Sequence, residues 1–240
     1  LVARARAAQR IADGYDQQRV DELVAAAGWA IIEPARNREL AELAVADTGI
    51  GNVEDKISKN GRKTLGLLRD LAGAKSVGVI AVDPARGIVE IARPVGVVCA
   101  ITPSTNPGAT PANKIINALK GRNAVIIAPS PKGFGTAERL VGFIHAQFDR
   151  IAAPRDLAQV LPAPISKAST AELMRQCDLV VVTAPFYFWG KYGENEQGSS
   201  HGSFYHYDTD VPVAFYGPWF QPGEYGVIEM VDFAATLTHV

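Results

Sequence analysis

One side chain suited to carbonyl chemistry, Asn106, lies in a polar loop of sequence Thr-Pro-Ser-Thr-Asn-Pro. The loop follows Val95 to Ile101, an apolar and β-branched run of the length of a buried strand. A carboxamide at the end of such a strand can donate to an oxyanion that develops on a reacting carbonyl group. The same side chain can instead cap the loop or the following helix, so the residue alone leaves a catalytic and a structural role open.

The elements around this loop predict how it is positioned. Thr110 or Pro111 can start a helix that ends at Gly121, and Asn123 to Ala128 forms a second buried strand. A strand, a loop, a helix and a strand make a right-handed βαβ crossover in a parallel sheet. The loop then lies at the carboxyl edge of the sheet, where ligands bind in such folds.

The rest of the chain extends the same pattern. Residues 1–72 are predicted to be helical, and a hairpin is predicted from Val77 to Val82 and from Ile88 to Ala92. Further helices and strands alternate after the central unit: a helix at 133–151, a strand at 157–161, a helix that Ser166 caps and that runs through Gln176, and a strand at 178–183. This alternation predicts a doubly wound α/β fold with a Rossmann-like parallel sheet and N-terminal helices.

The composition of the chain limits the kinds of molecule that the protein is expected to bind. The chain has 240 residues, a formal net charge of −1 and a pI of about 6.5, so its bulk charge gives no basis for binding nucleic acid or a membrane surface. Cys99 and Cys177 are too few for a disulfide framework, and the N-terminus lacks an apolar run of signal-peptide length. We therefore expect a cytoplasmic protein with a small-molecule partner.

Two segments carry a family resemblance. Residues 93–131 and the run Asp47-Thr48-Gly49-Ile50-Gly51-Asn52-Val53-Glu54-Asp55-Lys56 resemble the CoA-acylating branch of the aldehyde dehydrogenases, especially the acylating sulfoacetaldehyde dehydrogenases. The resemblance extends over about residues 1–183. It implies a reaction that converts an aldehyde and coenzyme A to acyl-CoA with NAD or NADP as the coenzyme. It also implies that a hairpin such as 77–92 takes part in a homo-oligomer.

The resemblance assigns roles to the loop residues. Asn106 would donate to the oxyanion of the thiohemiacetal. The residues before it would lie along the nicotinamide-ribose side of the coenzyme: Thr102, Pro103, Ser104 and Thr105. Ordinary turn chemistry accounts for these four residues equally simply.

A second set of coenzyme contacts is implied at Pro129, Ser130 and Pro131, which follow the next strand. Non-acylating relatives carry a Lys-Pro-Ser-Glu-like motif there that grips the adenosine ribose. This chain lacks the Lys and the Glu, as the acylating branch does, and the choice between NAD and NADP stays open. Lys132 and Arg139 could neutralise a 2′-phosphate or simply form a solvated helix face.

The nucleophile of this family is a cysteine in a separate domain. Cys99 lies within a predicted strand and Cys177 follows a predicted helix, so both are expected to be inert buried thiols, and neither is assigned as the nucleophile. We therefore expect no turnover from the chain as written.

The C-terminal segment is a different kind of sequence, and we place a boundary between 1–184 and 185–240. Residues 185–240 hold 14 of the 19 aromatic residues and a net charge of −6, against +5 for the rest. The segment, with its His-Gly-Ser motif, resembles the phosphodiesterase-like branch of the alkaline phosphatase superfamily, in which the histidine that maps to His201 binds zinc. The chain thus looks like a chimera of a truncated dehydrogenase and a phosphatase fragment. A zinc-dependent phosphoesterase and a catalytically silent binding module are the alternatives.

Overall fold

The computed structural model of the protein describes residues 1–182. Four parallel strands form its central sheet in the order β5-β4-β3-β6. Their bounds are β3 Val97–Thr102, β4 Ala124–Pro129, β5 Ala158–Val160 and β6 Leu179–Val182. Every β4 residue is buried, as is expected of a strand covered on both faces.

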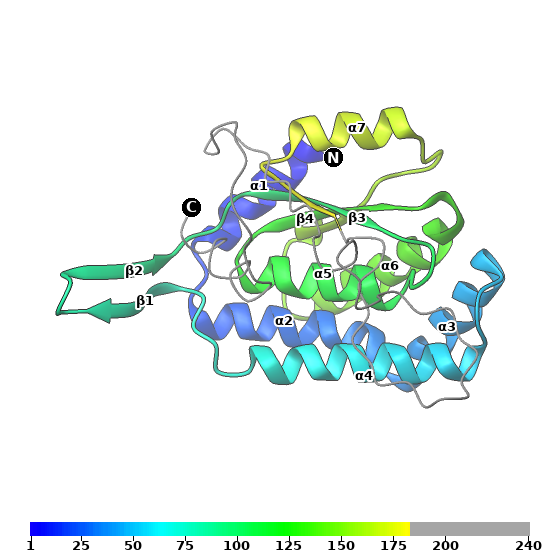
Figure 1. Cartoon of the computed structure of the whole chain (residues 1–240), viewed down its shortest axis with the longest axis horizontal. Coiled ribbons are helices and arrows are strands. Elements are labelled where there is room, and N and C mark those ends of the chain that lie inside the picture. Colours follow the sequence, from blue (N-terminus) through cyan, green and yellow to red (C-terminus); the bar gives the residue numbers. More distant parts are fainter. Residues whose placement is uncertain (183–240) are drawn as a thin grey trace, which may run out of the picture.

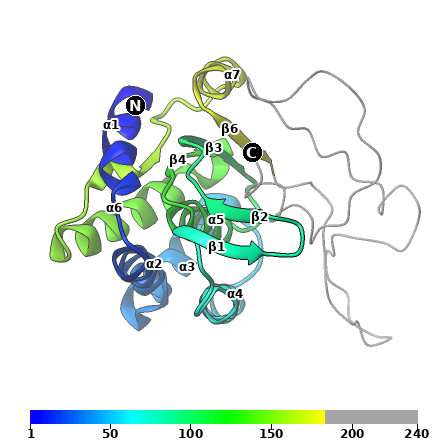
Figure 2. The same ribbon diagram turned by 90° about the vertical axis from the view of Figure 1, so that its left-hand side faces the viewer.

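Helices cover both faces of this sheet (Figures 1 and 2). Helices α5 (Ala109–Lys120) and α6 (Phe134–Arg150) lie on one face, and α1 (Val2–Asp13) and α7 (Lys167–Gln176) on the other. The crossovers β3-α5-β4 and β4-α6-β5 run in one direction, whereas the connection through α7 returns past β3 to β6. The predicted doubly wound α/β fold is confirmed.

The remaining N-terminal helices form a further layer beneath α5 and α6 (Figure 1). These helices are α2 Gln17–Ile32, α3 Pro34–Thr48 and α4 Val53–Leu71. Pro34 opens α3, and Gly49 ends it with a φ of +66°, a conformation that glycine adopts at little cost. Ser166 caps α7, as predicted, through a hydrogen bond from the Ser169 backbone N–H.

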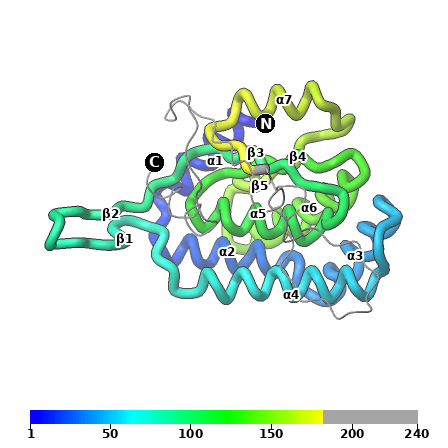
Figure 3. The backbone as a smooth tube through the Cα atoms, in the orientation of Figure 1, coloured from blue at the N-terminus to red at the C-terminus, as the bar shows by residue number. Residues whose placement is uncertain are grey.

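A two-stranded antiparallel hairpin, β1 (Gly78–Asp83) and β2 (Ile88–Ala92), projects from the body of the molecule (Figure 3). Its apolar side chains are about half exposed: Val79, Val82, Ile88, Val89 and Ile91. An isolated two-stranded hairpin is at best marginally stable in water. An exposed apolar hairpin of this kind is suited to pairing with another surface.

The start of β3 differs from the prediction. We expected a strand from Val95, but β3 begins at Val97. Gly96 has a φ of +133°, and the Asn123 side-chain oxygen accepts from the backbone N–H groups of Val95 and Gly96 at 2.7 and 3.0 Å. The backbone N–H groups of these two residues therefore bond to a side chain instead of to a neighbouring strand, although the Gly96 carbonyl still accepts from the Ala124 N–H of β4. Asn123, predicted as strand, precedes β4.

Candidate functional site

The two predicted groups of coenzyme contacts meet at one edge of the sheet. Thr102 and Pro129 are paired at the carboxyl ends of β3 and β4. The Ser130 backbone N–H donates to the Thr102 carbonyl oxygen at 3.0 Å. The direction of the crossovers reverses between β3 and β6, so the loop after β3 leaves the sheet at a topological switch point.

The predicted site residues differ in their access to solvent. Thr102 and Pro129 are buried, whereas Pro103 and Pro131 are exposed. Four are partly exposed: Ser104, Thr105, Asn106 and Ser130. The loop thus presents a mixed polar surface above two buried strand ends.

Asn106 does not cap the helix that follows it. The N-cap of α5 is Gly108, which makes no side-chain cap bond. Asn106 contributes only its backbone carbonyl, which accepts from the Thr110 N–H at 3.2 Å, and its side-chain oxygen is buried without a partner. Within residues 1–182 the side-chain NH₂ group makes no hydrogen bond either, so the helix-capping alternative is wrong.

Two hydroxyl oxygens at the same edge, Thr102 Oγ1 and Ser130 Oγ, are also buried, and neither has a hydrogen-bond partner among the described residues 1–182. Buried polar atoms of this kind are uncommon in folded proteins, and each one calls for a missing partner. The ribose hydroxyl and carboxamide groups of a dinucleotide are hydrogen-bond donors and acceptors. The polar atoms left over at this edge are therefore compatible with such a ligand.

Sequence reasoning missed Lys56, which touches the candidate loop from α4. Its Nζ donates to the Thr105 carbonyl oxygen at 2.8 Å, and the residue is 7% exposed. Burial lowers the pKa of Lys56, and the nearby charge of Lys59 lowers it further. The only signal in the sequence was its place in the Asp47–Lys56 segment, to which no role had been attached.

A second missed lysine, Lys114, lies on the partly buried side of α5. Burial lowers its pKa from the ordinary 10.5 to about 8, while the nearby Cys99 thiol acts in the opposite direction. A half-buried lysine near neutrality is a candidate for proton transfer. Its helical position alone did not reveal this, because periodicity treats lysine as a surface residue.

Both cysteines are buried, as predicted. The Cys177 thiol interacts with the Cys99 thiol, and this hydrogen bond, followed by burial, raises the pKa of Cys177. Thiolate is the nucleophilic form of cysteine. Cys177 is therefore held as a neutral thiol.

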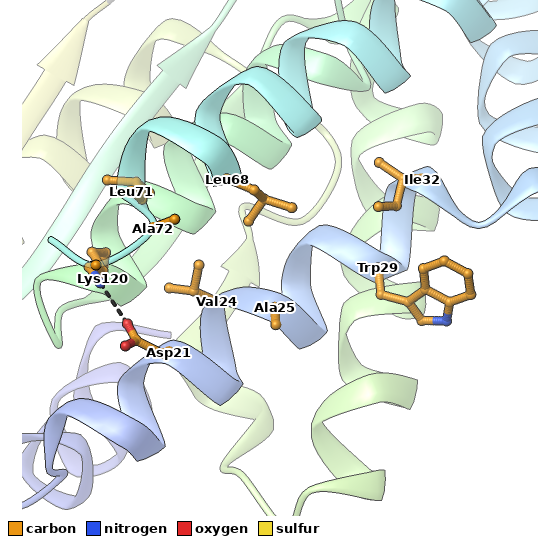
Figure 4. A pocket seen from close by; sticks show the side chains of 10 residues that line it. Asp21, Val24, Ala25, Trp29, Ile32, Leu68, Leu71, Ala72 and Lys120 are labelled. Carbon is orange, nitrogen blue, oxygen red and sulfur yellow. Dashed lines mark hydrogen bonds and ion pairs between the residues drawn. The ribbon is translucent and has the colours of Figure 1, made fainter.

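A groove of about 510 Å³ lies elsewhere, between α2 and α4 (Figure 4). Its walls include Val24, Trp29 and Leu68, and the ion pair of Lys120 with Asp21, at 2.6 Å, closes one end. Lys120 ends α5 just before β4 begins, so this end of the groove is at the amino edge of the sheet. The groove is separate from the loop that carries Asn106.

The zinc prediction at His201 and the phosphatase-like segment 185–240 lie outside the described residues. Between residues 1 and 182, the structure gathers no three His, Cys, Asp or Glu side chains that could hold a metal ion. None of the helices in this part of the chain combines the length and apolar content needed to cross a bilayer.

The chain belongs to the aldehyde dehydrogenase family, whose model matches residues 1–184. The acylating sulfoacetaldehyde dehydrogenase of Cupriavidus necator is 71% identical to it over 183 residues, which are 76% of this chain and 37% of the relative. This similarity supports the predicted placement in the acylating branch. The boundary that the sequence predicts between residues 184 and 185 stays a prediction.

Solved structures agree with this placement. An acetylating aldehyde dehydrogenase from Geobacillus thermoglucosidasius matches with a TM-score of 0.70 and 35% identity, covering 75% of this chain and 39% of that one. A propionaldehyde dehydrogenase from Rhodopseudomonas palustris, with bound propionyl-CoA, matches with a TM-score of 0.65 and 27% identity, covering 76% and 40%. The chain thus spans about two fifths of the length of these proteins.

Proposed function

We propose that residues 1–182 bind NAD or NADP at the carboxyl edge of the sheet, as the coenzyme-binding part of a CoA-acylating aldehyde dehydrogenase. The reaction consumes an aldehyde, the thiol of coenzyme A and oxidised coenzyme, and it yields acyl-CoA, reduced coenzyme and a proton. The bound coenzyme would supply the hydride acceptor. Sulfoacetaldehyde is the first aldehyde to test, since the acylating sulfoacetaldehyde dehydrogenase is so similar in sequence.

One observation carries the proposal: the free amide of Asn106 on a loop at the switch point of a parallel sheet. Its NH₂ group has no hydrogen bond within residues 1–182, and its oxygen is buried without a partner. A donor that is free before substrate arrives costs no reorganisation when an oxyanion forms. In this role Asn106 donates to the oxygen of the reacting carbonyl.

Three further residues would hold the coenzyme. The Ser104 and Thr105 side chains are partly exposed on the loop after β3, and the Ser130 hydroxyl lies after β4. The strand pairing that joins Thr102 to Pro129 keeps the two loops adjacent. One extended dinucleotide could therefore contact both loops.

We also propose that the hairpin β1-β2 forms a homo-oligomer by pairing with another copy of the chain. Exposed apolar side chains on a projecting two-stranded sheet favour a partner surface.

A fluorescence titration with NADH and NADPH tests the proposal. We expect saturable energy transfer from tryptophan to the reduced nicotinamide, with a preference for one of the two coenzymes. Asn106→Ala serves as the control variant. The Asn106 amide is proposed to act on the aldehyde oxygen and not on the coenzyme, so coenzyme affinity should stay within about twofold of wild type. Absence of saturable transfer in a chain that circular dichroism shows to be folded would refute the proposal.

A further inference from the structure

Helix α4 buries polar side chains where a scaffold helix would bury apolar ones. The three buried residues of this helix are Lys56, Asn60 and Thr64, which recur every four residues and so share one face. They are 7%, 4% and 0% exposed, whereas Leu65 of the same helix is 55% exposed. Burying polar groups costs free energy unless they find partners. The burial of these three polar residues therefore requires an explanation beyond packing.

Lys56 contacts the candidate loop immediately before Asn106. Its ammonium donates to the Thr105 carbonyl oxygen at 2.8 Å, and within residues 1–182 no carboxylate pairs with it. A buried ammonium that bonds a neutral carbonyl has a large desolvation cost and gains little stability from the contact. A net gain in stability therefore does not explain why a lysine occupies this position.

Asn60 contacts the same loop on the other side of Asn106. Its Nδ2 donates to Asn37 Oδ1 at 2.9 Å, and the Asn37 amide in turn donates to the Ile57 carbonyl at 3.1 Å. This chain of bonds fixes the Asn60 amide against Gly108, where a β-carbon would lie 3.3 Å from its oxygen. Lys56 and Asn60 thus hold α4 against both ends of the segment 105–108.

We propose that Lys56 is a positioning residue that fixes the segment 105–108 and thereby orients Asn106 and the coenzyme contacts before it. The inference rests on the proposed function of the loop. Asn60 supports the same segment from Gly108. Neither side chain takes part in the chemistry itself.

The test compares Lys56→Met with Lys56→Arg and with Lys63→Met. Lys56→Met keeps an apolar stem and removes the donor, and Lys56→Arg restores a charged donor. Lys63 is exposed on the same helix, so Lys63→Met controls for the loss of one positive charge from α4. All variants are studied in the full 240-residue chain.

Hydrogen exchange gives the first readout. The Thr110 and Ala112 amides donate to the carbonyls of Asn106 and Gly108, so they report on opening of the loop. In Lys56→Met we expect these two amides to exchange about tenfold faster, while the Ser130 amide, which bonds to the Thr102 carbonyl, is unchanged. The midpoint of thermal unfolding should stay the same or rise, because a buried charge has been removed.

Coenzyme affinity gives the second readout. We expect the dissociation constant for the preferred reduced coenzyme to rise about tenfold in Lys56→Met, because coenzyme binding must then also order the segment 105–108. It should return to within about threefold of wild type in Lys56→Arg and stay unchanged in Lys63→Met.

The outcomes separate the two proposals. Exchange in Lys56→Met that equals that of Lys63→Met overturns the inference, and so does faster exchange with unchanged coenzyme affinity. A folded wild-type chain that binds neither coenzyme refutes the proposed function instead, and the exchange comparison alone then decides whether Lys56 holds the loop.

Discussion

The carboxylate of Asp178 lies against the backbone of Gly96 so closely that a β-carbon on the glycine would be 2.3 Å from Asp178 Oδ2. The same oxygen accepts from the Val97 N–H at 2.8 Å and from Arg6 at 2.7 Å. Asp178 precedes β6, and Val97 begins β3. This contact therefore sets the start of the strand that leads to Asn106.

Gly96→Ala should destabilise the protein by roughly 3 kcal/mol, because it adds the clash with Asp178 to a φ of +133°. Chemical denaturation measures this change in the free energy of unfolding. Gly61→Ala is the control: Gly61 is within α4 with open space around it, so the change should be neutral or stabilising by up to about 1 kcal/mol. Equal effects of the two substitutions would contradict the described contact.

Combining Gly96→Ala with Asp178→Ala should cost less than the sum of the two single changes. The clash with the Asp178 carboxyl group is absent from the double variant, although the contact with the β-carbon of residue 178 and the backbone strain at residue 96 remain. Strict additivity in the double-mutant cycle would show that the two residues do not interact.

Asp47→Ala should destabilise the protein by about 1 to 2 kcal/mol through loss of a helix cap. Asp47, near the end of α3, accepts from the Thr136 backbone N–H at 2.7 Å and from its hydroxyl at 2.8 Å, in the first turn of α6. Urea unfolding at neutral pH provides the measurement. Glu42→Ala, which removes an exposed carboxylate from the same helix, should change stability by less than about 0.5 kcal/mol. Similar losses in both variants would argue against the cap.

Lys114 should make stability depend on pH above neutrality. Its folded pKa of about 8 is below its ordinary value of 10.5, so between these pH values the unfolded state binds more protons and this group's contribution to stability rises with pH. Lys114→Met should therefore be more stable than wild type at pH 7, by on the order of 2 kcal/mol, and lose this advantage by about pH 10.5. Urea unfolding across this range, with Lys63→Met as the exposed control, tests it. A difference between Lys114→Met and wild type that is independent of pH would contradict the lowered pKa.

If the hairpin β1-β2 forms an oligomer, charged side chains introduced on it should dissociate that oligomer. Val82 and Val89 face each other across the two strands and are 59% and 52% exposed. Replacing both with Lys should shift the chain to a monomer in light scattering coupled to size exclusion, without a loss of helix content. If the wild-type chain is itself monomeric at every concentration, the proposed pairing is wrong.

The strands around the site could be predicted because their signals are local. β-branched runs, prolines and Gly121 delimit β3, α5 and β4, and the crossover rule brings Thr102 beside Pro129. The start of β3 was misplaced because the Asn123 side chain, just before β4, accepts from two backbone N–H groups just before β3. No periodicity encodes such a contact.

The support of the loop could not be predicted. Lys56 and Thr105 are 49 residues apart in the chain, and a helical pattern assigns lysine to the solvent-exposed face. Only the packing of α4 against α5 and its loop decides that Lys56 is buried. That the Asn106 amide has no partner in the part of the chain that the structure describes likewise depends on tertiary structure, since sequence alone also allowed a helix cap.

The most direct test of the coenzyme site is hydrogen exchange of the full chain with and without saturating reduced coenzyme. We predict slower exchange in peptides that cover the ends of β3 and β4, at residues 102–112 and 129–133, and no change in the hairpin or along the groove beside Trp29. Unchanged exchange at both strand ends, or protection confined to the groove, would contradict the proposal that this edge of the sheet binds the coenzyme.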